Sequence, residues 1–310
     1  MSACSVIIVS KQGGALLFAT IETVLQQKQL AELIIVDNGN SPAVLTRLQQ
    51  RGLSEPRLKI ITGSSEINYA KSCNLAVKHA ASEYIIFLKS GYLLPPNAIL
   101  ELMAVNNVEN KAVLSGGLVQ HYDGSLQTVL RSKIITPKSV FGDIISFFTS
   151  KQKADNYLQQ SNISKNPFEV ATISSACMCV RVSDYKKLGG LDDDFYSQDE
   201  EYDFSLRVKQ IGGRVFCVPS VKIIHLPSEN DDVISISQRL SETKNIVRYL
   251  NKFFAAHQPF GTLFLLNILI FLRLAIKITV GGLSEFFRGG RSSENRIAVK
   301  RLMLLAMGVI

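Results

Sequence analysis

The chain has 310 residues, of which 46% are hydrophobic and 19% charged, and this composition excludes disorder as a global state. The formal net charge of +8 indicates an acidic partner, such as a nucleotide diphosphate or an anionic lipid surface. Aromatic residues do not interleave with basic runs, so nucleic acid is the partner that the sequence disfavours.

Short apolar runs alternate with helical patterns over the first ninety residues. The expected strands are Ser5–Ser10, Leu33–Val36, Leu58–Ile61 and Tyr84–Leu88. The expected helices between them are Ala15–Gln27, Ala43–Arg51 and Tyr69–Ala81. This alternation indicates an α/β fold, with a mostly parallel sheet and helices on both faces. Ligands bind beyond the carboxyl ends of strands in such sheets, so Ser10–Lys11, Asp37–Asn40 and Lys89–Tyr92 are expected around one crevice.

The middle of the chain is more mixed. A helix is expected at Asn97–Val105, begun by the proline pair at 95–96, because proline favours an early helical position. The further expectations are a helical insertion at Ser139–Ser164, one strand at Glu169–Arg181, a helix at Asp199–Ile211, and short strands at Val215–Val218 and Val221–His225.

The C-terminal section differs in composition. Phe260–Leu272 is almost purely apolar but too short to span a bilayer before Arg273 interrupts it. Residues 271–310 then carry seven Lys or Arg against two Glu. We therefore expect a catalytic domain at 1–255 and, at 256–310, a helical segment lying on an anionic membrane surface. The alternative is a helix packed on the catalytic domain or on a second copy in a homodimer.

Cysteine usage and the N-terminus point to the cytoplasm. The five cysteines are odd in number and irregularly spaced, which argues against a disulfide framework. The opening residues lack the basic start and long apolar core of a signal peptide. The expected location is therefore cytoplasmic, peripheral on the inner face of the cell membrane.

An acidic cluster is the densest feature of the sequence. It comprises Asp192–Asp194, Asp199–Glu201 and Asp203. A charge run is usually a solvated face. In this chain, however, Glu200 and Glu201 fall at the start of a helix, where a carboxylate is electrostatically favoured and well placed to act as a general base.

Two further residues have both a structural and a functional interpretation. Asp37 is either a turn residue or an acceptor for a base or ribose at the sheet crevice. His225 follows a strand, and a lone histidine is more often structural than a ligand. Neither the dinucleotide fingerprint GxGxxG nor a P-loop occurs, so those classes are disfavoured.

Several segments together carry a family resemblance over about residues 5–250. In chain order they read SVIIVSKQ, LIIVDNGN, NYAKSCNLAVKHA, FLKSGYLLPP and GGLDDDFYSQDEEYDFSLRVKQIGG, followed by CVPSVKIIHL. This order resembles that of family 2 glycosyltransferases with the GT-A fold. The stretch from Asp123-Gly124 through Arg131 to Pro137 is similar to their rhamnosyltransferase-like branch.

The resemblance implies an inverting transfer from a UDP- or dTDP-sugar to a lipid-linked or polysaccharide acceptor. It places the base at Glu201, beside Glu200, where the family normally has aspartate. It assigns His225 to a metal or to the diphosphate. The implied nucleotide-sugar-binding residues are Ser10, Asp37, Asn38, Lys71, Lys89, Ser90 and Gly91. The implied acceptor or sugar region includes Asp192, Asp199 and Arg131.

One departure from the family concerns the end of the fourth strand. The resemblance predicts a metal-binding aspartate where Gly91 stands, so a Mg2+ or Mn2+ cofactor is in question. Three readings follow: a metal-independent enzyme using Lys89, weak metal binding through His225 and the acidic cluster, or a catalytically degenerate member that only binds nucleotide-sugar or acts as a scaffold. A nucleotidyltransferase shares such a sheet, but the residues after Gly189 fit it poorly.

Overall fold

The structure, a computed structural model of the whole chain, describes residues 3–107, 111–127, 133–149, 163–195, 199–227, 236–259 and 261–287. The chain forms two compact units. Unit 1 comprises Met1–Ile134 and Ala154–Glu229, and unit 2 comprises Ile135–Lys153 and Asn230–Ile310.

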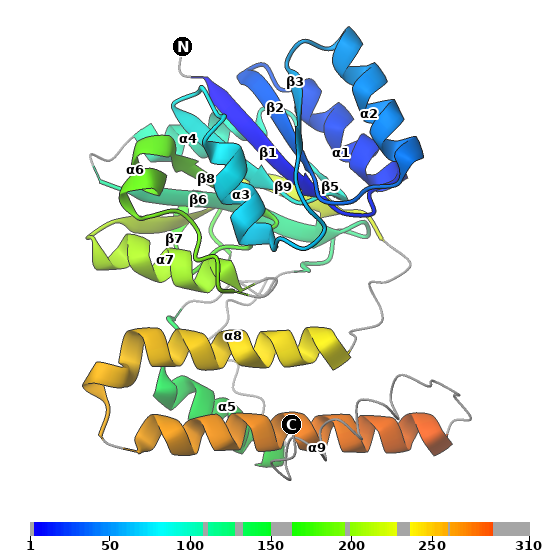
Figure 1. Cartoon of the computed structure of the whole chain (residues 1–310). Coiled ribbons are helices and arrows are strands. Elements are labelled where there is room, and N and C mark those ends of the chain that lie inside the picture. Colours follow the sequence, from blue (N-terminus) through cyan, green and yellow to red (C-terminus); the bar gives the residue numbers. More distant parts are fainter. Residues whose placement is uncertain are drawn as a thin grey trace. The chain divides into compact units, whose positions relative to one another are not determined.

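Unit 1 contains the sheet (Figure 1). Its strands are β1 (Cys4–Ser10), β2 (Leu30–Asp37), β3 (Leu58–Thr62), β4 (Tyr84–Leu88), β5 (Tyr92–Leu93), β6 (Val113–His121), β7 (Phe168–Glu169), β8 (Cys177–Arg181) and β9 (Arg214–His225). Its helices are α1 (Ala15–Leu25), α2 (Pro42–Ser54), α3 (Tyr69–Val77), α4 (Ala98–Asn107), α6 (Val182–Lys187) and α7 (Glu200–Gln210). The alternation predicted for the first ninety residues is confirmed, with shifts of a few residues at element ends.

The sheet is mixed rather than mostly parallel. Its strand order is β3-β2-β1-β4-β8-β6-β9-β5, with β7 paired to β9. Strands β1 to β4 are parallel, as predicted, and β6 is parallel to β9. By contrast, β8 runs antiparallel to both of its neighbours, and β5 and β7 run antiparallel to β9. A buried apolar run does not state its direction, and only the regular strand and helix spacing of the first half carried that signal.

Helices cover both faces of this sheet, because successive strand side chains point to opposite sides. In β1, Val6 and Ile8 enter one core together with Leu17 of α1 and Leu102 of α4. The intervening Ile7 enters the other core, which also contains side chains from α3, α6 and α7. The second core lies beneath α7, the helix that carries Glu200, Glu201 and Asp203 of the acidic cluster.

The predicted single strand at Glu169–Arg181 is wrong. Only Phe168–Glu169 and Cys177–Arg181 pair in the sheet, as β7 and β8. Val170 and Ile173 lie between them and are buried in the second core. Their apolar character therefore reflects burial of a connecting segment and not strand pairing.

The two short strands predicted near residue 220 form one continuous strand, β9. The β6–β9 register shifts where Gly117 and Leu118 meet Val218 and Lys222. This irregularity accommodates Pro219, which has no N–H to donate. A side chain at Gly117 would bring its Cβ within 2.3 Å of the Val221 carbonyl oxygen, so the close approach of the strands requires glycine.

All five cysteines lie in unit 1 and are free and buried. Burial raises the pKa of each thiol, to about 12 for Cys179 and Cys217. The sequence predicted no disulfide framework, and all five thiols are free.

Unit 2 is helical and consists, in its described part, of α5 (Pro137–Thr149), α8 (Ile236–Phe254), the short 3-10 helix η3 (Ala255–His257) and α9 (Thr262–Phe287). Helix α9 contacts both α8 and α5. The predicted insertion at Ser139–Ser164 is helical as far as Thr149, and 150–162 lie outside the described residues. None of the described helices is both long enough and apolar enough to cross a bilayer.

Candidate functional site

Three parallel strands have their C-terminal ends side by side, and these strand ends form one edge of the site. Ser10 of β1 pairs with Asp37 of β2, and Asp37 pairs with Thr62 of β3. One side chain, Asn40, fastens this edge. Its N–H and Nδ2 donate to Asp37 Oδ1 at 2.9 and 2.6 Å, and its Oδ1 accepts from Ser10 Oγ at 2.9 Å and from the Gly13 N–H at 2.6 Å. The Asp37 carboxylate is thus oriented before any ligand arrives.

Asn38 connects this edge to α3. Its backbone N–H donates to the Ser10 carbonyl at 2.8 Å, and its Nδ2 donates to Ser72 Oγ at 2.6 Å. The buried Asn38 Oδ1 has no hydrogen-bond partner among the described residues. Lys71 lies in the first turn of α3 with an exposed side chain. The structure therefore places Ser10, Asp37, Asn38 and Lys71 at one end of the sheet, as the sequence predicts.

Lys89 follows β4 and occupies a half-buried position between elements. Its Nζ donates to Ser175 Oγ at 2.6 Å and lies 5.2 Å from the ring centroid of Tyr69. Its backbone N–H donates to the Ala176 carbonyl at 3.0 Å, continuing the β4–β8 pairing beyond the strand. The ammonium is therefore held by a hydroxyl and an aromatic face.

Gly91 and His225 are neighbours across the β5–β9 pairing. The Leu226 N–H donates to the Gly91 carbonyl at 2.9 Å, and Tyr92 pairs with His225. The Tyr92 and His225 rings stack with centroids 4.3 Å apart and an interplanar angle of 17°. His225 Nδ1 lies 2.8 Å from Gln127 Nε2.

These residues fit a divalent cation poorly. Gly91 has no side chain to coordinate one, and the His225 imidazole is already engaged through one nitrogen and one face. Within the described ranges, no three His, Cys, Asp or Glu side chains are grouped so that they could hold a metal ion. We therefore assign no metal-dependent step to this site.

Helix α7 begins with two glutamates whose carboxylates each have a buried oxygen. Glu200 is 1% exposed, and its Oε1 has no hydrogen-bond partner among the described residues. Glu201 is half-buried as a residue, but its Oε2 is buried and likewise without a partner in the described part of the chain. The pKa of Glu201 is raised to about 8, chiefly by burial and then by the charge of Glu200, with a smaller contribution from Asp199, while the Lys89 charge lowers it. A carboxyl with this pKa can take up a proton near neutral pH.

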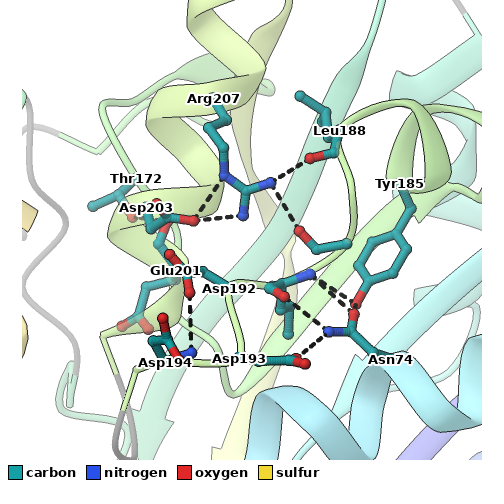
Figure 2. Close-up of polar contacts among 12 residues, drawn as sticks. Asn74, Thr172, Tyr185, Leu188, Asp192, Asp193, Asp194, Glu201, Asp203 and Arg207 are labelled. Carbon is teal, nitrogen blue, oxygen red and sulfur yellow. Dashed lines mark hydrogen bonds and ion pairs between the residues drawn. The ribbon is translucent and has the colours of Figure 1, made fainter. Parts of the chain in front are cut away.

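The rest of α7 is fixed from beneath. Asp203 pairs with Arg207 one turn later, and the Arg207 Nη1 donates to the carbonyls of Leu188 and Gly190 at 2.6 and 2.8 Å (Figure 2). Thr172 Oγ1 donates to the Glu201 carbonyl at 3.4 Å. Asp203 is therefore a structural member of the acidic cluster, and the N-terminal turn of α7 is held in one position.

The loop Asp192–Asp194 is fastened to α3 by two asparagines. Asn74 Nδ2 donates to the Leu191 carbonyl at 2.8 Å and to Asp193 Oδ1 at 2.6 Å, as Figure 2 shows. Asn68 Nδ2 donates to the Phe195 carbonyl at 3.0 Å. Asp192 Oδ1 accepts from the Asp194 N–H at 3.0 Å, which gives Asp192 a role in the turn itself. Arg131, the third predicted residue of the acceptor region, lies outside the described residues.

Several residues around the site were not singled out from the sequence. Tyr69 and Ser175 contact Lys89, and Asn74 contacts Asp193 of the acidic cluster. Asn40 was expected at the crevice as part of Asp37–Asn40, and its contacts with Asp37 and Ser10 agree with turn chemistry after a strand-end aspartate. Ser175 had no signal in the sequence, since its segment was expected to be an ordinary strand.

Comparison with known proteins gives consistent matches. The family model described as "Glycosyl transferase family 2" matches residues 5–189. The O-antigen biosynthesis protein RfbC of Myxococcus xanthus is 25% identical over 231 residues, which are 71% of this chain but only 17% of that much longer relative. An N-acetylglucosaminyl-diphospho-decaprenol L-rhamnosyltransferase of Mycobacterium tuberculosis is 18% identical over 212 residues, 65% of this chain and 68% of the relative.

Two solved structures share the fold. GalNAc-T7 with UDP, GalNAc and Mn2+ has a TM-score of 0.60 at 16% identity and covers 80% of this chain and 47% of its own. The mannosyltransferase PcManGT from Pyrobaculum calidifontis, in complex with GDP-Man and Mn2+, has a TM-score of 0.57 at 12% identity and covers 98% of this chain and 81% of its own. At these identities the likeness shows the fold.

Proposed function

Because the chain belongs to glycosyl transferase family 2, we propose that it is an inverting glycosyltransferase of cell-surface glycan synthesis. The donor would be a UDP- or dTDP-sugar, with rhamnose as the leading candidate, and the acceptor a lipid-linked or polysaccharide glycan. The names of the O-antigen biosynthesis protein and the L-rhamnosyltransferase support this choice. One observation carries the catalytic part: a buried carboxyl with raised pKa, Glu201, near the Lys89 ammonium.

The proposed reaction is a single displacement. An acceptor hydroxyl attacks the anomeric carbon of the donor while the bond from that carbon to the diphosphate oxygen breaks. The electron pair of the broken bond leaves with the diphosphate, and the Glu201 carboxylate takes the hydroxyl proton. One displacement at one carbon inverts its configuration. Glu201 must therefore be ionised when the acceptor binds and protonated after transfer.

Asp37 is the proposed contact for the nucleoside. Its Oδ1 is occupied by Asn40, while Oδ2 makes no hydrogen bond to any described residue. Oδ2 is thus the atom available to accept from a base N–H or a ribose hydroxyl. Because Asn40 also holds Ser10, the nucleoside end of the site is preorganised by one side chain.

Replacing Glu201 by glutamine tests the assignment of the base. Donors are first screened as UDP- and dTDP-sugars by thermal shift, since a ligand bound only by the folded state raises stability. We expect Glu201→Gln to keep its nucleotide affinity and to lose transfer by about 100-fold or more, because glutamine cannot take up a proton. The measurements are nucleotide affinity by calorimetry and turnover with a glycan acceptor.

Glu83→Gln is the matched control. Glu83 is exposed and directly precedes β4. It therefore lies at the N-terminal end of that strand, away from the site, and its variant should transfer normally. The alternative proposal, a nucleotide-sugar-binding or scaffolding protein without catalysis, is favoured by the glycine at position 91. A wild-type protein that binds a donor and transfers nothing, or a Glu201→Gln variant with undiminished turnover, would remove the proposed mechanism.

We further propose that unit 2 attaches the protein to an anionic membrane. Large apolar side chains lie on one side of α9, at the helical spacing i, i+1, i+4, i+7 and i+8. This α9 stripe consists of Phe264, Leu265, Ile268, Phe271 and Leu272, all exposed. The other side of the helix is buried through Leu263, Leu266, Ile270 and Leu274. The excess of Lys and Arg in residues 271–310 complements anionic lipid, which suits a lipid-linked acceptor.

A further inference from the structure

We propose that the Lys89 ammonium neutralises the diphosphate of the donor in place of a divalent cation, so that this chain binds nucleoside diphosphates without a metal. The inference deepens the proposed function and rests on it. It also accounts for the poor fit of the residues around Gly91 to the Mn2+ named for both similar structures.

The order of the strands places Lys89 where a diphosphate would lie. The sheet runs β2-β1-β4-β8 at this point, so Lys89 follows a strand that lies two places from Asp37. Two strand spacings amount to about 10 Å. On the other side, Lys89 is near enough to Glu201 for its charge to act on that carboxyl. The ammonium is therefore about two strand spacings from the nucleoside contact and within electrostatic reach of the proposed base, which is why we place the diphosphate beside it.

The contacts of Lys89 leave it able to bind phosphate. An ammonium carries three donors. Among the described residues its hydrogen-bond acceptor is Ser175 Oγ, at 2.6 Å, and the Tyr69 ring supports the charge without using a donor. Two N–H groups remain for phosphate oxygens, as charge-assisted hydrogen bonds. Ser175 and Tyr69 fix the ammonium before the ligand binds, and a half-buried position strengthens its field.

There is room for a side chain at Gly91, where the family resemblance predicts a metal-binding aspartate. A Cβ at Gly91 would lie 3.8 Å from the nearest Leu16 atom, an ordinary contact. Its φ of +88°, however, favours glycine over any residue that could coordinate a cation. The neighbouring imidazole of His225 is stacked on Tyr92 and contacts Gln127, while Lys89 supplies an ammonium two residues before Gly91.

In the transfer step, Lys89 acts on the leaving group. As the bond from the anomeric carbon to the diphosphate oxygen breaks, negative charge grows on that oxygen and its phosphate. The ammonium donates to these oxygens and remains protonated throughout, while the acceptor proton goes to Glu201. No other reactant is required.

Binding of UDP and dTDP to the full-length protein tests the inference. We expect wild-type affinity for the bound diphosphate to change less than twofold between EDTA and added Mn2+ or Mg2+. Lys89→Met keeps the length of the side chain but removes the charge. It should lower the affinity for the nucleoside diphosphate by about 10- to 100-fold. The same variant should bind uridine or thymidine as the wild type does, because the loss concerns phosphate alone. Lys89→Arg should restore most of the diphosphate affinity.

Lys78→Met serves as the control, because Lys78 is an exposed lysine at the C-terminal end of α3. Two results would overturn the inference while leaving the proposed glycosyl transfer intact: a tenfold or larger gain in diphosphate affinity with Mn2+, or Lys89→Met binding the diphosphate like the wild type. A wild-type protein that binds neither diphosphate would overturn both the inference and the proposed function.

Discussion

Glu201 is a carboxyl that the fold has left without a hydrogen-bond donor to its buried Oε2 within the described residues. Desolvation penalises the charged form, and the neighbouring Glu200 charge penalises it further. Structural carboxylates in this chain are treated differently: Glu32 accepts from Ser5, Lys59 and the Ala81 N–H, and its pKa is lowered. Such a contrast supports the proposal that Glu201 takes up the acceptor proton.

A pH profile of kcat/KM should therefore rise through about pH 8. Below this value Glu201 is mostly protonated and cannot accept the acceptor proton, while above it the carboxylate predominates. With the pKa of Glu201 at about 8, roughly a tenth of the protein is active at pH 7, so the rate should gain close to tenfold on going to pH 9.5. Steady-state rates between pH 6 and 9.5 provide the measurement.

The Glu200→Gln variant gives a second test of the pH profile. It removes one of the negative charges that raise the pKa of Glu201, so the midpoint should move to lower pH. A rate that stays flat from pH 6 to 9.5 in the wild type would speak against Glu201 as the base.

At the scale of elements, α3 is the piece that holds the site together. Its cap residue Asn68 accepts from the Lys71 N–H at 2.9 Å, and Asn74 one and a half turns later grips the acidic loop. Asn74 Oδ1 also accepts from the Leu191 N–H at 3.0 Å and from Tyr185 Oη at 2.5 Å. This helix therefore joins the nucleoside edge, through Ser72 and Asn38, to the loop before α7.

Two adjacent glycines allow the contribution of this contact to be measured. Gly189 and Gly190 have nearly equal φ values of +79° and +77°, but only Gly190 is crowded, with a Cβ position 2.4 Å from Asn74 Oδ1. Gly189→Ala should cost about 1–2 kcal/mol for its backbone conformation alone. Gly190→Ala should cost about 1–3 kcal/mol more, because Asn74 must leave its partners. Urea unfolding gives the loss in free energy of unfolding for both variants. Equal losses would show that Asn74 moves away from the added methyl group without destabilising the protein.

The parallel strands β1 to β4 were predictable from the sequence, whereas the pairing of the remaining strands was not. Ser10, Asp37 and Lys89 follow apolar runs in a repeating strand and helix pattern, so their placement at one edge followed from the sequence. The direction of β8 and the place of Ser175 depend on contacts far apart in the chain. Glu201 was predictable as a helix-start carboxylate and through the family resemblance, but the burial that raises its pKa required the structure.

At the scale of the whole molecule, unit 2 is expected to act as a membrane contact. Phe264 and Leu265 are 68% and 62% exposed. Replacing both by glutamate should lower partition onto phosphatidylglycerol vesicles by at least about tenfold, because each large apolar side chain contributes about 1.5–3 kcal/mol when removed from water. Co-sedimentation with sucrose-loaded vesicles is the measurement, with phosphatidylcholine vesicles showing the share that depends on anionic lipid.

Leu53→Glu is the matched control for this experiment. Leu53 is 89% exposed at the end of α2 in unit 1, so its variant should bind vesicles normally. If the double variant binds vesicles unchanged but turns a dimer into a monomer in sedimentation, the α9 stripe covers a second copy and the membrane proposal is wrong.

The five buried thiols give the molecule built-in reporters of its own opening. A thiol reagent attacks the thiolate, and burial suppresses that form at every cysteine of the chain. Alkylation must then wait for a local fluctuation, so its rate at each sulfur ranks the segments of unit 1 by how readily they open. Cys73 is the most telling of the five, since it lies in α3 one turn from Tyr69, and a bound donor should slow its labelling.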